Sequence, residues 1–301
     1  MIENALSSAA APPARVPAMR PTMPAPILAL FLLAAPAPGV AAPARPVVAA
    51  TVAPLGGLVE RLAGAAAEVV VLVPPGFEAE SYAPAPRQMA ALERAVLAVE
   101  VGHPALQLES RFLGPWLDRR PHVARVRLAA QFEERAGLDP GDPHLWTSVR
   151  AMRGLAAALA RALAAAVPAE AEGIRRRART LDGEIAALDA GLSTRFRGAA
   201  GRRFLIFHPV LGAFAADYGL EQRAIEHDGK EPGPARLAAL IEEARGSGAR
   251  AVLVQRGAPT RAAEVLARAI GARTLEIDPM PRDWLAGMRR IGDSVAEALG
   301  R

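Results

Sequence analysis

Short apolar runs bounded by glycine or proline alternate with helical patterns along most of this 301-residue chain. This alternation constrains the fold strongly, because repeated strand–helix–strand units build a parallel sheet covered by helices. We therefore predict an α/β fold with parallel strands in both halves of the chain. The strands are expected at Val47–Ala53, Glu68–Val73, Ala95–Val101, Val123–Leu128, Arg203–Phe207, Arg223–Ile225, Arg250–Val254 and Thr274–Ile277. The helices between them are expected at Leu55–Ala63, Pro86–Arg94, Gly212–Tyr218, Pro234–Arg245, Thr260–Ile270 and Pro281–Leu299.

A stretch without strand patterns, residues 148–197, separates the two halves. Pro168 interrupts it and should begin a second helix, since proline is tolerated in a first helical turn. The helix that follows has one apolar stripe, formed by Leu181, Ile185, Leu188 and Leu192. Such a stripe fits a simple core helix or a rigid rod that joins two lobes. The position between two α/β halves favours the rod.

The N-terminal segment resembles an export signal. Arg15 and Arg20 precede an apolar stretch over residues 24–40 that is too short and too rich in proline to span a bilayer. We predict that residues 1–44 are a removable signal peptide and that the mature protein is soluble in the periplasm. The alternatives for the start codon are Met19 and Met23, and those for cleavage are Ala42 and Ala44.

Composition excludes several classes of protein. The chain has no cysteine, which excludes disulfides, thiolate metal sites and a lipid-modified cysteine anchor. The net charge is only +5, and the dense arginine run at residues 175–179 is interpreted as a solvated helix face. We therefore expect no nucleic-acid partner and no membrane anchor, and nothing demands more than a monomer.

Five candidate metal ligands lie in loops or turns of the predicted α/β units. His208, Asp278, Glu80 and His103 follow predicted strands, and His144 lies in a turn rich in Pro, Gly and Asp before a helix. Loops at the carboxyl ends of parallel strands converge on one cleft. Two imidazoles and two carboxylates suit zinc, manganese or ferrous iron. Each residue also has a purely structural interpretation, as a helix cap, a packing group or loop charge.

Four segments resemble the periplasmic metal-binding proteins of zinc- and manganese-type ABC importers, in order and in spacing. These segments are LVPPGFEAESYAPAPRQMAAL, GDPHLWTSVRAM, FHPVLGAFAADYGLEQRAIE and VLVQRGAPTRAAEVLARAIGARTLEIDP. The resemblance implies two α/β lobes joined by one long helix, with the metal between them. It also implies capture of the ion and delivery to an ABC permease with its ATPase, without chemical turnover, so the chain is not expected to be an enzyme.

The resemblance also implies a ligand set. His144, His208 and Asp278 stand where the family keeps three of its four ligands, and Glu80 stands where the family usually has histidine. His103 is the alternative group that replaces or supplements Glu80. A second carboxylate would shift preference from zinc towards manganese or iron, although zinc stays the first expectation. The histidine-rich loop of many zinc-type members is absent before His144. Because neutral imidazoles bind metals, affinity is expected to fall as the pH drops through roughly 6.5.

Two rival functions and a set of domain boundaries complete the expectations. A secreted metallohydrolase would use the same residue types, but the chain has no HExxH segment. A binding protein of the same fold with a drifted site would no longer hold metal. The predicted boundaries are 1–44 for the signal peptide, 45–168 for the N-terminal lobe, 169–197 for the interlobe helix and 198–301 for the C-terminal lobe.

Overall fold

The computed structural model describes residues 11–15, 45–131, 139–226, 229–246, 248–257 and 261–301. The chain divides into two units, Met1–Pro43 and Ala44–Arg301. In the first unit only residues 11–15 are described, as exposed coil, so the predicted signal peptide and its cleavage site lie almost wholly outside the described residues. Within the described part of the chain, no helix combines the length and apolarity needed to cross a membrane.

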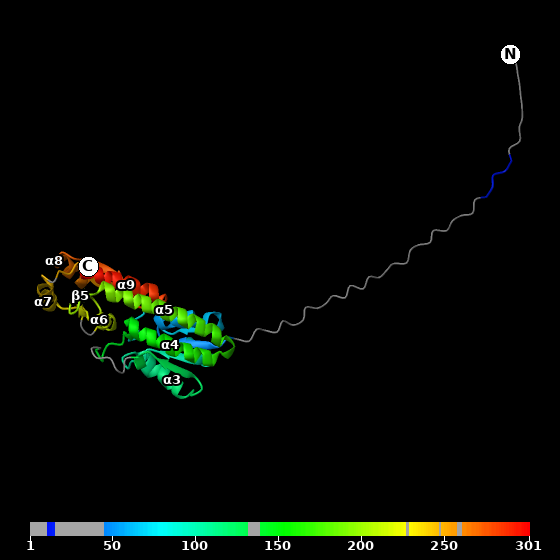
Figure 1. Ribbon diagram of the computed structural model, residues 1–301, viewed down its shortest axis with the longest axis horizontal. Helices are drawn as coiled ribbons and strands as arrows, with labels where there is room; N and C mark the ends of the chain where they lie inside the picture. Colours follow the sequence, from blue (N-terminus) through cyan, green and yellow to red (C-terminus); the bar gives the residue numbers. More distant parts are fainter. Residues whose placement is uncertain (1–10, 16–44, 132–138, 227–228, 247, 258–260) are drawn as a thin grey trace, which may run out of the picture. The chain divides into compact units, whose positions relative to one another are not determined.

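The second unit contains two four-stranded parallel sheets (Figure 1). The first sheet has the order β2-β1-β3-β4 and the second the order β6-β5-β7-β8, so both share one topology. The first sheet is formed by β1 (Val47–Ala50), β2 (Glu68–Val71), β3 (Ala95–Glu100) and β4 (Ala124–Arg127). The second is formed by β5 (Arg203–Ile206), β6 (Glu221–Ala224), β7 (Ala251–Gln255) and β8 (Arg273–Ile277). In both sheets the strand order reverses beside the first strand, at the point where open α/β sheets place their ligands.

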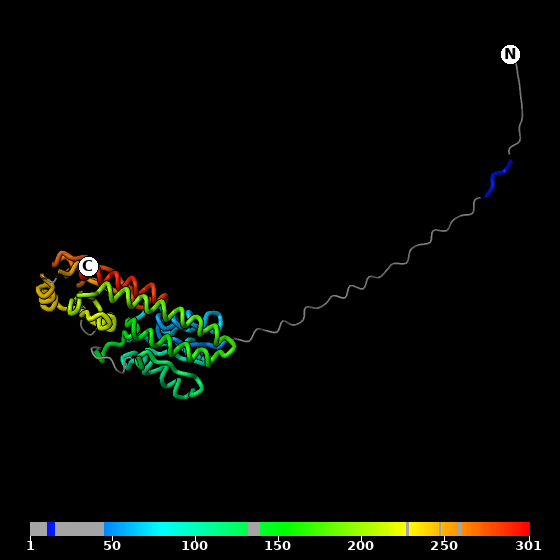
Figure 2. Tube along the Cα trace, viewed as in Figure 1, coloured from blue at the N-terminus to red at the C-terminus, as the bar shows by residue number. Residues whose placement is uncertain are grey.

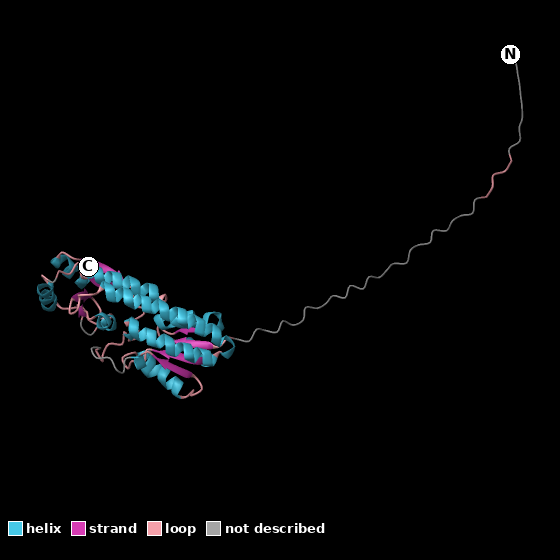
Figure 3. Ribbon diagram, in the orientation of Figure 1, coloured by secondary structure: helices cyan, strands magenta, loops and turns pink. Residues whose placement is uncertain are grey.

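The strands in the middle of each sheet are buried between layers of helices. Every residue of β1 is buried, and β7 is buried up to its last residue, Gln255. Strands covered on both faces have continuous apolar runs rather than alternating ones. Such runs allowed these strands to be predicted from the sequence. Figure 3 shows the strands of both sheets flanked by helices. The predicted fold class is thereby confirmed.

The helices match the expected ranges closely, with differences at their ends. They are α1 (Ala53–Ala63), α2 (Pro86–Ala91), α3 (Gly114–Asp118), α4 (Val149–Ala166), α5 (Ala171–Arg195), α6 (Gly212–Tyr218), α7 (Pro234–Ala244), α8 (Arg261–Ile270) and α9 (Trp284–Ala298). The last helix begins three residues later than predicted, because the side chain of Asp283 accepts a hydrogen bond from the Ala286 amide and caps it. The short helix α3 was not predicted.

The long helix α5 connects the two lobes, as Figure 2 shows by tracing the chain between them. Its predicted stripe is buried. Near its start, the Arg177 guanidinium donates to the carbonyl oxygens of Leu62 and Ala63 at the end of α1, at 2.6 and 3.0 Å. Near its other end, Leu192 packs close to Gly292 in α9. The helix is therefore held by both lobes, as the rod interpretation requires.

Direct contacts also join the lobes near the carboxyl ends of their strands. The Trp146 indole donates to the carbonyl oxygen of Pro279, and the Trp284 indole donates to the carbonyl oxygen of Trp146, both at 2.8 Å. Arg282 forms an ion pair with Glu60 in α1, with Nε 3.0 Å from Oε2. These bonds fix how the loop after β8 meets the segment that contains His144 and Trp146.

Gly57 in α1 gives this interface a testable steric limit. A Cβ atom at Gly57 would lie 1.9 Å from the carbonyl oxygen of Arg282, which is backbone and cannot rotate away. We expect Gly57→Ala to lower the free energy of unfolding by roughly 1–3 kcal/mol, measured by thermal or urea unfolding. The control is Gly183→Ala in α5, where nothing lies within 4 Å of an added Cβ. That change should raise stability by about 1 kcal/mol, because alanine favours helix. Equal effects of both changes would contradict the close contact.

Candidate metal centre

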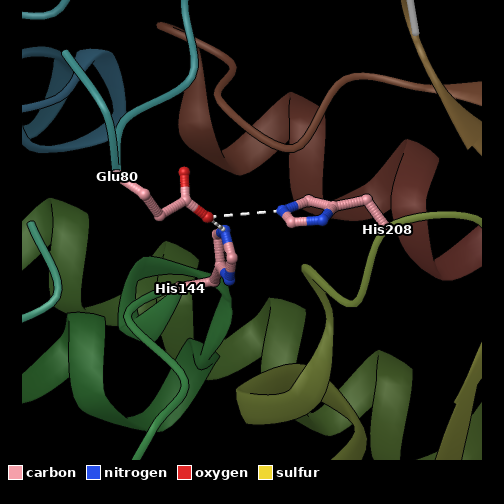
Figure 4. Close-up of side chains that lie close together, drawn as sticks. All are labelled: Glu80, His144 and His208. Carbon is pink, nitrogen blue, oxygen red and sulfur yellow. Dashed lines mark hydrogen bonds and ion pairs between the residues drawn. The ribbon is translucent and has the colours of Figure 1, made fainter. Parts of the chain in front are cut away.

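Glu80, His144 and His208 converge on one point between the two sheets (Figure 4). Glu80 Oε1 lies 2.7 Å from His144 Nε2 and 3.3 Å from His208 Nε2. The two imidazole rings are nearly perpendicular, with centroids 5.3 Å apart. All three side chains offer a metal-binding atom, and these atoms lie within 4.8 Å of one another.

Each of the three residues comes from a different segment. Glu80 lies in the loop after β2, where its carbonyl oxygen accepts a hydrogen bond from the Gln107 amide at 3.1 Å. His208 lies two residues beyond β5, as the sequence predicted. His144 directly precedes a single helical turn and is buried, with only 5% of its surface exposed. The first sheet thus supplies Glu80 and the second supplies His208.

Two carboxylates that the sequence analysis did not single out hold the imidazoles in place. Asp142 Oδ1 lies 2.8 Å from His144 Nδ1 and also accepts a hydrogen bond from the His144 backbone amide. Glu226 Oε1 lies 2.5 Å from His208 Nδ1. Both rings therefore direct Nε2 towards Glu80. A ring that donates Nδ1–H to a carboxylate while Nε2 remains for the ion is the usual arrangement of metal-binding histidines.

Only one of these carboxylates left a signal in the sequence. Asp142 stands two residues before His144, which is the spacing of a side chain that bonds the following turn. Glu226 became a neighbour of His208 because β5 and β6 pair in parallel, with Ile206 opposite Ala224. Two residues further along both strands, the pairing brings His208 and Glu226 together. That partnership depends on strand order, which a single sequence does not reveal.

The hydrogen bonds among the three converging side chains shift their pKa values. Burial raises the pKa of the Glu80 carboxyl, but hydrogen bonds from His144 and His208 outweigh it and hold that pKa well below its usual range. Burial lowers the pKa of His144, yet the bonds to Asp142 and Glu80 raise it to about 9. Burial also lowers the pKa of His208, but Glu80 and Glu226 raise it above its ordinary value. Without metal, the neighbouring carboxylates therefore favour the protonated form of both imidazoles.

The geometry fits a divalent transition metal. Zinc bonds of 2.0–2.2 Å to nitrogen and oxygen in a tetrahedron would place the bound atoms about 3.4 Å apart. The separation of 3.3 Å between Glu80 and His208 matches this value, and the one of 2.7 Å between Glu80 and His144 needs a small opening. Two nitrogens and one carboxylate oxygen also suit manganese and iron.

Asp278 lies near this group without being part of it. It lines the same pocket as Glu80 and His144, a cavity of about 190 Å³. Its Oδ1 accepts a hydrogen bond from the Met280 amide at 3.0 Å. Among the described residues, the clustered metal-binding atoms belong to Glu80, His144 and His208 alone. The predicted fourth ligand is therefore adjacent to the cluster, and its role stays a prediction.

His103 lies in a different cavity from Glu80. Its Nε2 is 2.9 Å from the carbonyl oxygen of Pro140, and its Nδ1 accepts a hydrogen bond from the Ala105 amide. The cavity beside it is lined by the buried carboxylates Glu100 and Glu109. Of the two alternatives predicted to complete the site, the structure brings Glu80 to His144 and His208 and does not bring His103.

Asp142 and Glu226, which bond the Nδ1 atoms of the two imidazoles, should contribute strongly to the affinity for zinc. We expect Asp142→Asn and Glu226→Gln each to weaken zinc binding about 10–100-fold, because the neutral amide no longer fixes the tautomer or strengthens the imidazole as a donor. Isothermal titration calorimetry with zinc measures this loss. Asp139→Asn is a matched control, because Asp139 bonds the Gly141 amide in the same loop. A weakening of similar size in the control would show that loop structure, and not the imidazole contact, is responsible.

Sequence comparison relates most of the second unit to one family of metal-binding proteins. Residues 48–298 match the family described as zinc-uptake complex component A, periplasmic. The High-affinity zinc uptake system protein ZnuA of Paracoccus denitrificans is 27% identical over 271 residues, which covers 73% of this chain and 79% of that protein.

Solved structures of ZnuA have a fold similar to that of this chain. A crystal structure of ZnuA superposes with a TM-score of 0.76 and 26% identity, covering 85% of this chain and 99% of the other. A ZnuA mutant that lacks residues 138–173 and has zinc bound superposes with a TM-score of 0.74 and 27% identity, covering 84% of this chain and 98% of the other. The order of strands, the long helix and the matched residues together show that this chain belongs to the family of periplasmic metal-binding proteins of zinc-uptake ABC importers.

Proposed function

We propose that this protein captures a divalent transition metal ion outside the cytoplasm and delivers it to an ABC permease. One observation carries the proposal: two imidazoles and a carboxylate converge, and each imidazole is fixed by a carboxylate of its own. This arrangement brings metal-binding atoms from separate segments of the chain within 4.8 Å of one another. It holds an ion between two lobes, as a carrier requires.

Zinc is the ion that we propose first. The similar ZnuA structure with zinc bound and the zinc uptake protein of Paracoccus denitrificans support this choice. Glu80 is a harder donor than histidine, so manganese and iron are the alternatives. Glu80, His144 and His208 are the proposed ligands, and Asp278, which lines the same pocket, is the proposed fourth. His103 remains the alternative to Glu80 that variants can test.

Each part of the chain has a proposed role in this function. Residues 1–44 serve as the export signal, residues 45–168 and 198–301 form the two lobes, and residues 169–197 form the helix between them. The mature protein is a monomer in the periplasm that loads one ion and docks on the membrane permease of an importer, whose ATPase drives transport. Capture and delivery involve no chemical turnover of the ion.

Metal titration of the purified metal-free protein tests this function. We expect wild type to bind one zinc ion per chain and Glu80→Ala to lose most of the affinity, because one of the three converging donors is gone. His103→Ala should bind zinc like wild type, because its ring faces Pro140. Failure of wild type to bind zinc, manganese or iron would contradict the proposed function. Equal losses in both variants would contradict the choice of Glu80.

A further inference from the structure

The helix α6 begins four residues after His208 and lies against the segment that contains His144. It packs on the single helical turn Leu145–Thr147, which directly follows His144. The two imidazoles of the metal centre are therefore connected by a route that does not pass through the long helix α5. Two contacts, one at each end of α6, determine how closely this helix approaches the His144 segment.

At the start of α6, Gly212 makes room for the carboxylate that orients His144. A Cβ atom at Gly212 would lie 2.2 Å from Asp142 Oδ2. The other oxygen of that carboxylate, Oδ1, bonds both Nδ1 and the backbone amide of His144 at 2.8 Å. The Asp142 side chain is only 6% exposed, and a close-packed interior leaves it no space into which it could retreat. A methyl group at position 212 would therefore push the carboxylate away from His144.

At the other end of α6, Asp217 bonds the first turn of α4, which begins five residues after His144. The Ser148 hydroxyl donates to Asp217 Oδ2 at 2.9 Å, and the Arg150 amide donates to the same oxygen at 3.1 Å. The Ser148 hydroxyl also caps α4, because it accepts a hydrogen bond from the Ala151 amide. Asp217 is buried, and a carboxylate at a helix N-terminus is favoured by the helix dipole as well as by its hydrogen bonds. Asp217 thus fixes the end of α6 to the segment that follows His144.

The end of α6 is also held by α5. The Tyr218 hydroxyl donates to Asp189 Oδ1 in α5 at 3.2 Å. The rings of Phe214 and Tyr218 pack against Phe196, which directly follows α5, with centroids 5.8 and 5.6 Å away. Because α6 is held from this side, the loss of either contact with the His144 segment should displace that segment and not α6.

We propose that Gly212 and Asp217 are positioning residues of the metal centre, through which α6 fixes the place of His144 relative to His208. The inference rests on the proposed function, in which both imidazoles bind the ion. Neither residue belongs to the cluster of metal-binding atoms among the described residues, so each acts through the His144 segment.

Calorimetric titration of Gly212→Ala with zinc tests the first contact. The variant should bind zinc about 10–100-fold more weakly than wild type, the loss expected when an imidazole loses its outer carboxylate. This loss should disappear in the Asp142→Ala background, because the added methyl group then meets no carboxylate, so the double variant should bind zinc like Asp142→Ala alone. Gly154→Ala is the matched control, because its Cβ would lie 2.3 Å from Gln131 Oε1, outside the metal centre. It should bind zinc like wild type.

Asp217→Ala tests the second contact. It should weaken zinc binding about 2–30-fold, the range for residues that act on a site through other groups. Its matched control is Asp182→Ala, which removes a carboxylate that α5 presents to Arg153 of α4 at 2.6 Å.

Visible absorption of the cobalt-loaded proteins provides a readout that a loss of stability alone does not move. The absorption bands of cobalt depend on the arrangement of the donor atoms around the ion. Gly212→Ala and Asp217→Ala should change these bands, and both control variants should keep those of wild type.

The proposal is overturned if Gly212→Ala binds zinc like wild type, or if its loss is equally large in the Asp142→Ala background. It is also overturned if Asp217→Ala and Asp182→Ala give the same zinc affinity and the same cobalt bands. Failure of wild type to bind zinc, manganese or iron would contradict the proposed function as well. Zinc binding by wild type together with any of the other outcomes contradicts this inference alone.

Discussion

Zinc is expected to raise the melting temperature of the wild-type protein by about 10 °C when its free concentration is about 1,000 times the dissociation constant. Binding to the folded state alone stabilises it by about 4 kcal/mol under these conditions. For a chain of this size, 1 kcal/mol corresponds to a shift of roughly 2–4 °C. Differential scanning calorimetry with and without zinc measures the difference.

His208→Ala should remove most of this shift. The variant loses one imidazole donor, and the Glu226 carboxylate behind it no longer has a ring to orient. The loss of affinity should exceed the 10–100-fold typical of losing an outer partner. His122→Ala is the control, because His122 is exposed and lies outside the metal centre. A zinc-dependent shift of wild-type size in His208→Ala would remove His208 from the ligand set.

The apparent affinity for zinc should rise steeply between pH 6 and 9. Burial lowers the pKa of His144, but Asp142 and Glu80 raise it to about 9, and the pKa of His208 is also raised. Zinc must displace the Nε2 protons of both rings. Each displaced proton makes the affinity change about tenfold per pH unit below the pKa concerned.

This result would correct the expectation from the unperturbed imidazole, which placed the fall near pH 6.5. Titrations at pH 7 in buffers with different enthalpies of ionisation should report at least one proton released per zinc, the one held by His144. The metal-free fold should show the opposite trend. A raised folded pKa stabilises it below about pH 6.5, and this contribution is lost as the pH rises through about 9. An affinity that is constant above pH 7 would contradict protonated imidazoles in the metal-free site.

Sequence patterns predicted the fold well because buried parallel strands and long amphipathic helices leave local signals. The stripe of α5 and the apolar run of β5 are of this kind. The end of a strand was harder to predict. The sequence pattern predicted a strand at Arg223–Ile225, whereas β6 spans Glu221–Ala224. This edge strand begins earlier because Glu221 pairs with Arg203 of β5, so the strand includes polar residues.

The candidate site was predictable as far as single segments allow. Glu80 and His208 follow strands in the sequence and His144 lies in a turn, and the fold brings the three together. His103 has the same local context, and its ring turns instead to the carbonyl oxygen of Pro140. The partnership of Glu226 with His208 depends on which strands are neighbours. Side-chain direction and strand order are properties of the whole fold, so local patterns do not encode them.

The two indole hydrogen bonds between the lobes have a consequence for selectivity. Trp146 is two residues from His144, and its indole bonds the carbonyl oxygen of Pro279, next to Asp278. The Trp284 indole bonds back to Trp146. Much of the entropy of ordering the site is therefore lost during folding and not during binding. We therefore expect the site to tolerate little change in ionic radius, so that ions of equal charge but different size should bind with different affinities.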